Sequence, residues 1–369
     1  MKTEAPKISA FQLATIGFFL SNALFVGLGT INVLSLAKQD AWISTVIALF
    51  IGLIPIGILL YVMNYRPDQN ILEKNKSLFG KLIGNIINII LSAYILLITV
   101  LLLWSVTNFA ITMYLVKTPS NFIAIIFTMT AVYAVIKGIE TISRTSEVLF
   151  FLTLISVVVI TISLISYTQI DNLKPFLAEG IIPPIKYSFF FISYWLTPII
   201  FLTIIPKNNI VNKHYNKYLI GGLIAGLVVM LSVYIIVPAT ITPPLAALYR
   251  FPAYYVQRKI SIGGAIDNVE NFLSIHWYFN AFLLITMGIY FLQTHVKDIF
   301  KMKTPRSMNI TTIIIGLIIV IIQNYVFPNA AMSLDFMKDT FPLYISLSLF
   351  ILMLIIGLVI FTKRNKKKA

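Results

Sequence analysis

Ten apolar runs, each long enough to cross a lipid bilayer, make up most of this sequence. A bilayer core needs roughly 20 helical residues to cross it. Because lipid offers the backbone no hydrogen-bond partners, such spans fold as helices. The sequence therefore predicts an all-α integral membrane protein with about ten transmembrane helices in a single membrane domain, residues 1–369. The runs lie near residues 10–37, 42–64, 82–104, 121–139, 148–166, 183–205, 218–241, 271–296, 310–327 and 341–362.

Composition excludes several classes of protein. With 59% hydrophobic and 11% charged residues, the chain cannot be an ordinary soluble domain. Its net charge of +15 would suit nucleic acid, but the basic residues lie in short segments between the apolar runs, so no nucleic-acid partner is expected. The first run is too long for a cleavable signal peptide and should remain as a span. Without cysteine there is no disulfide or thiolate chemistry.

The distribution of basic residues predicts the topology. Of the 28 Lys and Arg residues, 20 fall on the side of the membrane that holds both ends of the chain. The positive-inside rule then places both termini of this multi-pass membrane protein in the cytoplasm. The basic tail, residues 363–369, fits orientation and contact with anionic lipid; docking of a partner is the alternative.

Two glycines interrupt the first apolar run, at Gly27 and Gly29. Glycine permits backbone conformations that break a helix and leave N–H and C=O groups unpaired. Inside a membrane such groups persist only where protein or a polar ligand satisfies them, as in the binding sites of transporters. The alternative is that these glycines let another helix pack closely.

Several short motifs, in order along the chain, resemble one known family. They are Gln39-Asp-Ala-Trp-Ile-Ser44, Lys81-Leu-Ile-Gly84, Lys117-Thr-Pro-Ser120, Gly138-Ile-Glu-Thr-Ile-Ser-Arg144, Asn172-Leu-Lys-Pro-Phe-Leu-Ala-Glu-Gly180, and Asn268-Val-Glu270 with Trp277. Together they resemble the B subunit of bacterial spore germinant receptors, within the amino acid–polyamine–organocation transporter superfamily.

The resemblance implies two five-helix inverted repeats, about residues 10–166 and 183–362, with broken helices one and six around a pocket of amino-acid size. It also implies partner subunits A and C and a place in the spore inner membrane. The residues give separate support, because Pro183-Pro184 and Pro198 interrupt the sixth run. Breaks at matching places in two halves indicate a site near the membrane midplane.

These breaks predict how an amino acid is held. The backbone of Gly27, Leu28, Gly29 and Thr30 would present N–H groups to its carboxylate. Carbonyls freed near Tyr194 and Thr197 would accept from its ammonium group, with Trp195 or Trp104 as cation–π partners. For both tryptophans the alternative is anchoring at the lipid interface.

Other polar groups receive structural interpretations. Glu140, Arg144 and Glu147 have the spacing of a local ion-pair cluster, or alternatively of a gating latch, and Glu270 is grouped with them as a structural or gating residue. Residues 242–270, aromatic and basic, predict a helix in the membrane interface; the alternative is a gate over the pocket or a contact with a partner. The three histidines lack metal-ligand spacing, so no metal, cofactor or catalysis is expected.

The sequence is compatible with two main functions and with a third that it favours less. No Asp or Glu lies at the centre of a predicted span, and proton relays normally need one. This favours a nutrient sensor, the ligand-binding subunit of a germinant receptor that detects an amino acid. The alternative is an amino-acid permease of the same superfamily. A structural subunit with a vestigial pocket is the third candidate, since fold alone does not determine function.

Overall fold

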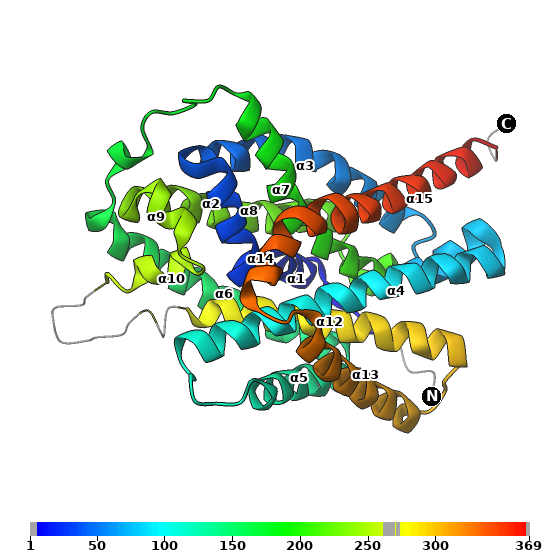
Figure 1. Cartoon of the computed structure of the whole chain (residues 1–369). Coiled ribbons are helices and arrows are strands. Elements are labelled where there is room, and N and C mark those ends of the chain that lie inside the picture. The colour runs from blue at the N-terminus through cyan, green and yellow to red at the C-terminus, as the bar shows by residue number, and fades with distance from the viewer. Residues whose placement is uncertain (1–5, 261–269, 271–273, 367–369) are drawn as a thin grey trace.

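The structure, a computed structural model, describes residues 6–260, 270 and 274–366. Helices dominate it (Figure 1). The long helices are α3 (Ala41–Asn64), α4 (Ile71–Met113), α5 (Ser120–Lys137), α6 (Ile139–Leu164), α7 (Ile182–Leu196), α8 (Tyr215–Ile241), α12 (Ile275–Phe300), α13 (Pro305–Val326) and α15 (Leu347–Lys366). The short helices are α1 (Ala10–Ala23), α2 (Thr30–Ala37), α9 (Pro243–Leu248), α10 (Pro252–Gln257) and α14 (Ala330–Asp335).

Short segments of other geometry join these helices. Two are π-helical, η1 (Phe25–Gly29) and η7 (Phe336–Ser346), and two are strands, β1 (Ile8–Ser9) and β2 (Ile210–Val211). The 3₁₀ segments are η2 (Lys38–Asp40), η3 (Ile165–Tyr167), η4 (Ile170–Leu173), η5 (Thr197–Ile204) and η6 (Lys207–Asn209).

The expected class, an all-helical membrane protein, is confirmed. Within the described residues nine helical segments are long and apolar enough to cross a membrane, and α1 is a further apolar helix of 14 residues. Large apolar side chains cover the outside of the bundle; Leu82 is 77% exposed and Ile182 76%. In water these surfaces would be costly, whereas lipid matches them.

Some predicted boundaries were wrong. The third span is not confined to 82–104, because α4 begins at Ile71 with a capping box between Asn70 and Glu73. A bend at Gly80, where φ is 80° and ψ 170°, separates this first arm from the apolar remainder. Likewise α6 begins at Ile139, not near 148, since Gly138 with a φ of 93° ends α5 and the new helix follows at once.

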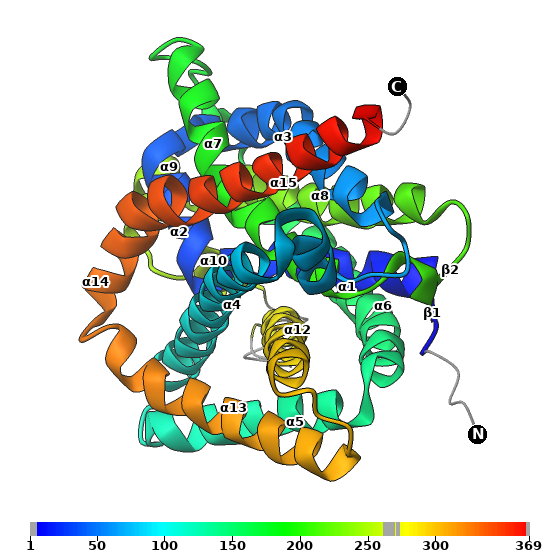
Figure 2. The same cartoon turned by 90° about the vertical axis from the view of Figure 1, so that its right-hand side faces the viewer.

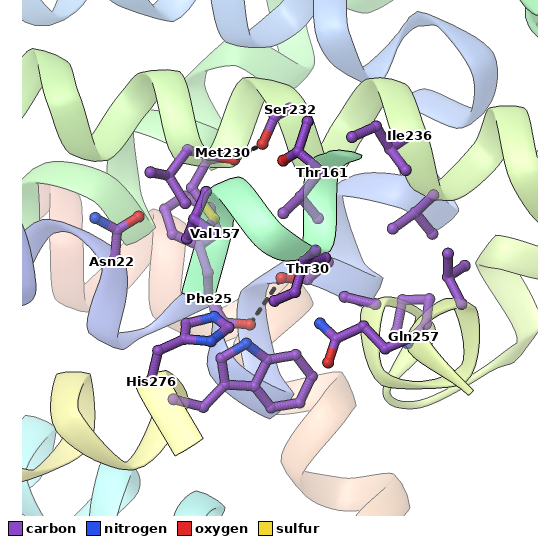
Figure 3. A pocket seen from close by; sticks show the side chains of 18 of the residues that line it. Asn22, Phe25, Thr30, Val157, Thr161, Met230, Ser232, Ile236, Gln257 and His276 are labelled. Carbon is purple, nitrogen blue, oxygen red and sulfur yellow. Dashed lines mark hydrogen bonds between the residues drawn. The ribbon is translucent and has the colours of Figure 1, made fainter. Parts of the chain in front are cut away.

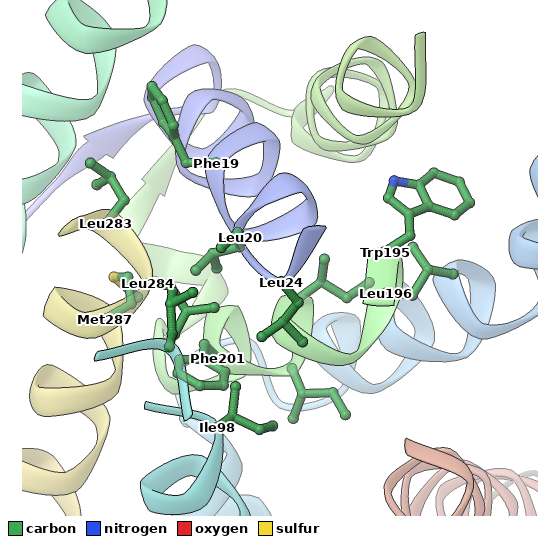
Figure 4. Packing of buried hydrophobic residues seen from close by; sticks show 14 of the residues in the cluster. Phe19, Leu20, Leu24, Ile98, Trp195, Leu196, Phe201, Leu283, Leu284 and Met287 are labelled. Carbon is green, nitrogen blue, oxygen red and sulfur yellow. The ribbon is translucent and has the colours of Figure 1, made fainter. Parts of the chain in front are cut away.

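The core lies where α1 crosses the middle of the bundle. There α1 contacts α6, α7, α8, α12 and η5. Figure 4 shows the apolar side chains that meet around it. They are Phe19, Leu20 and Leu24 of α1, Ile98 of α4, Trp195 and Leu196 of α7, Phe201 of η5, and Leu283, Leu284 and Met287 of α12, and all are buried.

The two predicted interruptions are present. The first predicted span consists of α1, η1 and α2, so the helix changes to π geometry where the glycines lie. The sixth changes from α7 to the 3₁₀ segment η5 at Thr197, next to Pro198. A third irregular span, η7 with Pro342 inside it, precedes α15 and had no prediction.

Strand β1 precedes the first interrupted span and β2 follows the sixth, so their pairing brings the start of one span beside the end of the other. They pair in parallel, with Ile8 opposite Ile210. In Figure 2 this pair lies at the near end of the bundle, where the C-terminal end of α15 also lies. Segments α9 and α10 lie at the opposite end in Figure 1. The first and last helices therefore begin and end on one side of the bundle.

Candidate functional site

The backbone N–H groups at the interruption in the first span are hydrogen-bonded within the span itself. The Gly29 N–H donates to the Leu24 carbonyl over 2.9 Å, and the Thr30 N–H donates to the Phe25 carbonyl. Both bonds span five residues, which is the π pattern. The Thr30 hydroxyl also donates to the Phe25 carbonyl, at 2.9 Å (Figure 3). In this conformation, two of the N–H groups predicted to bind a carboxylate are therefore occupied.

Glycine at position 29 permits a close approach of α7. A Cβ there would lie 3.0 Å from the Tyr194 ring and 3.1 Å from the Leu24 carbonyl oxygen. Tyr194 is fully buried, and its hydroxyl donates to the Met337 carbonyl of η7 at 2.5 Å. The ring stacks on Phe341 with centroids 5.8 Å apart. The structure thus brings together η1, the end of α7 and η7, three irregular spans.

The other predicted binding residues near this break are packed against protein. Leu28 is fully buried. Trp195 is fully buried too, and its indole N–H donates to the Leu223 carbonyl of α8 over 3.2 Å. The Thr197 hydroxyl lies 2.6 Å from that of Ser346, which is the last residue of η7. Interface anchoring, the alternative interpretation of Trp195, does not fit a side chain in the core.

A cavity of about 70 Å³ lies on the other side of η1. Its walls come from α1 and η1, α2, α6, α8, α10 and the start of α12 (Figure 3). Of the predicted binding residues that the structure describes, Thr30 lines it. Figure 3 shows Asn22 and Gln257 at opposite sides, with Phe25, Thr30 and His276 between them. The break and the cavity therefore share the two residues Phe25 and Thr30.

The segment between α9 and α10 closes one end of this cavity. Phe251 of this segment and Tyr254 of α10 are buried in an aromatic cluster with Phe109 and Trp277. Sequence analysis predicted either an interfacial helix or a gate here. Helix α10 packs against α6, α8 and α9, and both interpretations stay predictions. Residues 261–269 and 271–273 of the predicted segment lie outside the described residues, and Glu270, which is described, is 4% exposed.

Arg250 is the charged residue of the cavity wall. Its guanidinium carbon lies 5.4 Å from the centroid of the Trp104 ring and 5.3 Å from that of Phe251. Burial lowers the pKa of this guanidinium to about 10, because removal from water disfavours the charged form. The ring of Trp104, predicted to hold the ammonium group of a ligand, thus faces a cation of the protein itself.

Polar atoms without partners face the same space. Among the described residues, the amide oxygens of Asn22 and Asn280 and the hydroxyl of Thr153 are buried without a hydrogen bond. These three residues are 2%, 3% and 1% exposed and all line the cavity. These three residues were not among the predicted binding residues, because the prediction considered only charged residues within the apolar spans. An isolated asparagine in such a span was the available signal.

The predicted ion-pair cluster has other partners. The Glu140 carboxylate accepts from the Lys7 backbone N–H at 3.0 Å, and the Glu147 carboxylate accepts from the Gln12 side chain at 3.2 Å. Arg144 is exposed, and within the described chain no ion pair joins it to either carboxylate. The two carboxylates thus tie α6 to the start of α1, and their gating role stays a prediction.

This geometry defines a multi-pass helical membrane protein with an interrupted first span beside a buried cavity. The sequence profile of the family described as spore germination protein matches residues 7–329. The chain is 26% identical to spore germination protein KB of Bacillus subtilis strain 168, over 99% of this chain and 98% of that protein. Spore germination protein A2 of the same strain is 25% identical, over 88% and 87%. Spore germination protein XB of Bacillus anthracis is 24% identical, over 90% and 91%.

The chain therefore belongs to the spore germination protein family. The match covers nearly the whole chain, so the family resemblance that the short motifs indicated is confirmed. Members of this family are membrane proteins and are generally not enzymes. In the described residues no group of three or more His, Asp or Glu side chains could hold a metal ion.

Proposed function

We propose that the protein is the nutrient-sensing B subunit of a spore germinant receptor, which detects an amino acid and acts through partner subunits A and C. One observation carries this proposal. An interrupted helix, with π geometry at Phe25–Gly29, forms a wall of a cavity lined by Phe25 and Thr30, and such turns are frequent at functional sites. A ligand in that cavity contacts the part of the protein that can change shape.

Such a sensor works by a shift in population. The ligand must bind one conformation better than another, and the difference in affinity sets the size of the response. In the conformation described, the N–H groups of Gly29 and Thr30 are satisfied within η1. We infer that opening this π turn is the conformational change, and that the backbone of residues 27–30 then becomes available to the nutrient or to water.

The wider arrangement belongs to the same proposal. Both termini would lie in the cytoplasm, because most of the basic residues lie on their side. The two halves would be inverted repeats, with α1–η1–α2 corresponding to α7–η5. Both carry an interruption within a buried span, which supports this correspondence. The membrane would be the inner membrane of the spore.

Gly29→Val tests the proposal. The new side chain would meet the Tyr194 ring and the Leu24 carbonyl, so it should hold η1 in a changed geometry. Spores carrying the variant should show no response to the nutrient, measured as the fall in optical density on germination. Gly57→Val is the matched control, since a Cβ at Gly57 meets nothing within 4 Å. A normal dose response from Gly29→Val, at equal protein abundance, would refute a site at η1.

A further inference from the structure

Arg250 carries hydrogen-bond donors that the protein does not use. Its Nε is buried without a partner. In the described chain its guanidinium lies over the rings of Trp104 and Phe251. A cation–π contact uses the charge of the guanidinium and takes up none of its N–H donors. A planar guanidinium with free donors binds a carboxylate through two parallel hydrogen bonds.

The same cavity also has acceptors that the protein does not use. The amide nitrogen of Asn22 donates to the Phe18 carbonyl at 2.8 Å, and that of Asn280 donates to the His276 carbonyl at 2.9 Å. These bonds fix both amide groups. Each amide oxygen remains buried and unpaired. Buried acceptors without donors are unfavourable unless a ligand or water supplies a donor, and an ammonium group has three.

The rest of the lining is largely apolar. Its walls include Phe18, Phe25, Val157, Met230 and Val233. Such walls favour an aliphatic group of the ligand, and the hydroxyls of Thr153, Thr161 and Ser232 line the same cavity. Among the described residues that line the cavity there is no Asp or Glu that could pair with Arg250 or with a basic ligand.

We propose that Arg250 binds the α-carboxylate of the nutrient and that the amide oxygens of Asn22 and Asn280 accept hydrogen bonds from its ammonium group. The cavity then selects a zwitterionic α-amino acid with a small aliphatic side chain. This deepens the proposed sensing function and rests on it. The carboxylate contact comes from the segment between α9 and α10 instead of from the backbone of η1.

Because the cavity is small, binding of a carboxylate at Arg250 should be linked to movement of the cavity wall. A volume of 70 Å³ holds about two water molecules. An amino acid therefore enters when part of the wall moves outward. Arg250 stands two residues before α10, so a carboxylate bound there engages the segment that closes the cavity. Binding and displacement of α10 are then one event.

Binding of radiolabelled L-alanine, L-valine and L-leucine to the purified full chain in lipid nanodiscs tests the proposal. Two analogues separate the contacts, L-valinamide, which lacks the carboxylate, and isovalerate, which lacks the ammonium group. On the wild-type chain L-valine should bind more tightly than either analogue, by about 10–100-fold, as expected for loss of a charged hydrogen bond.

Arg250→Gln should weaken L-valine by about the same 10–100-fold and leave L-valinamide unchanged, so that the two ligands become equal. A purely structural role of Arg250 would weaken both ligands together. Arg258→Gln is the matched control, because Arg258 is exposed in the same segment and loses the same charge. Asn280→Leu should in turn reduce the advantage of L-valine over isovalerate.

The outcomes are decisive in each direction. Equal affinity of wild-type protein for L-valine and L-valinamide overturns the role of Arg250, even if Arg250→Gln fails to fold. Equal affinity for L-valine and isovalerate overturns the role of the two asparagines. If spores respond to a sugar or nucleoside but none of the three amino acids binds, this inference and the amino-acid part of the proposed function fail, and the nutrient-sensing role stands. If no nutrient in a broad panel triggers germination through this protein, the sensing function itself fails.

Discussion

The Tyr194 hydroxyl donates a hydrogen bond to the backbone carbonyl of Met337, across 143 positions of sequence. It joins the end of α7 to the π-helical start of the last span. The same ring lies against Gly29, so one side chain connects three interrupted spans. A change at any of them reaches the other two through Tyr194.

Removal of this hydroxyl should lower stability. Tyr194→Phe leaves the Met337 carbonyl without its partner, at an expected cost of about 1 kcal/mol in the free energy of unfolding. The apparent Tm of detergent-solubilised protein should fall. Tyr215→Phe is the matched control, since the Tyr215 hydroxyl is buried with no hydrogen-bond partner among the described residues. Its Tm should be unchanged or higher, and a similar loss in both variants would contradict the role of the bond.

Two adjacent glycines of α8 should respond oppositely to alanine. A Cβ on Gly222 would lie 2.3 Å from the Ala14 carbonyl oxygen, whereas one on Gly221 meets nothing within 4 Å. Gly222→Ala should force α1 and α8 apart and cost roughly 1–3 kcal/mol. Gly221→Ala should stabilise the helix by roughly 0.5–1 kcal/mol, because alanine has less backbone freedom to lose. Thermal unfolding of the two variants in detergent measures the sign of each effect. A Gly222→Ala variant as stable as Gly221→Ala would show that the two helices separate easily.

Lys74 should stabilise the end of α3. Its ammonium group is buried and donates to the carbonyls of Val62 and Met63, both at 3.0 Å, in the last turn of that helix. Lys74→Met removes a donor from both carbonyls and leaves the Val62 carbonyl with the Tyr65 backbone N–H at 3.3 Å, so a loss of about 1–3 kcal/mol is expected. The exposed Lys81 on the same helix gives the control, and Lys81→Met should change stability by less than about 0.5 kcal/mol. Comparable Tm values for the two variants would show that Lys74 does not stabilise the end of α3.

Liposomes separate the sensor from the permease. A sensor needs only a difference in affinity between two states, whereas an accumulating permease must also couple its solute to an ion gradient. Purified protein in liposomes should therefore bind its amino acid without concentrating it under an imposed proton or sodium gradient. Accumulation that disappears when the gradient is collapsed would make the protein a permease.

Linkage supplies a second measurement on the same question. If the nutrient alters the affinity for the A subunit, then the A subunit must alter the affinity for the nutrient by the same factor. The dissociation constant of the amino acid should therefore differ between the isolated chain and the complex with subunits A and C. Identical constants would show that binding is not coupled to the partners.

Hydropathy predicted the spans well because a membrane helix must be both apolar and long. It failed at the edges, where local signals decide. The capping box at Asn70 and the bend at Gly80 add an arm to α4 that has too little apolar content to be read as membrane. The break at Gly29 was predicted from glycine. Its π geometry was not predicted, because the sequence does not indicate which backbone carbonyl the Gly29 N–H binds.

The cavity was harder to predict than the fold. Arg250 falls in a segment that hydropathy assigns to the outside, and only the tertiary packing of α10 brings it to Trp104. Asn22 and Asn280 lie on helices α1 and α12, more than 250 positions apart. Neither has a local pattern that indicates a ligand. Their common feature, an amide oxygen without a donor, exists only in the folded chain.

The pairing of β1 with β2 has a consequence for movement. It fastens the start of α1 to the loop that leads into α8, and the close approach at Gly222 fastens the body of α1 to α8 itself. Helix α1 is thus held at its end and along its side and belongs to the stationary part of the molecule. Helix α2 contacts α9 and α7 and has no comparable attachment to a strand. If η1 changes geometry as proposed, we expect α2 to move relative to α1, which stays fixed to α8.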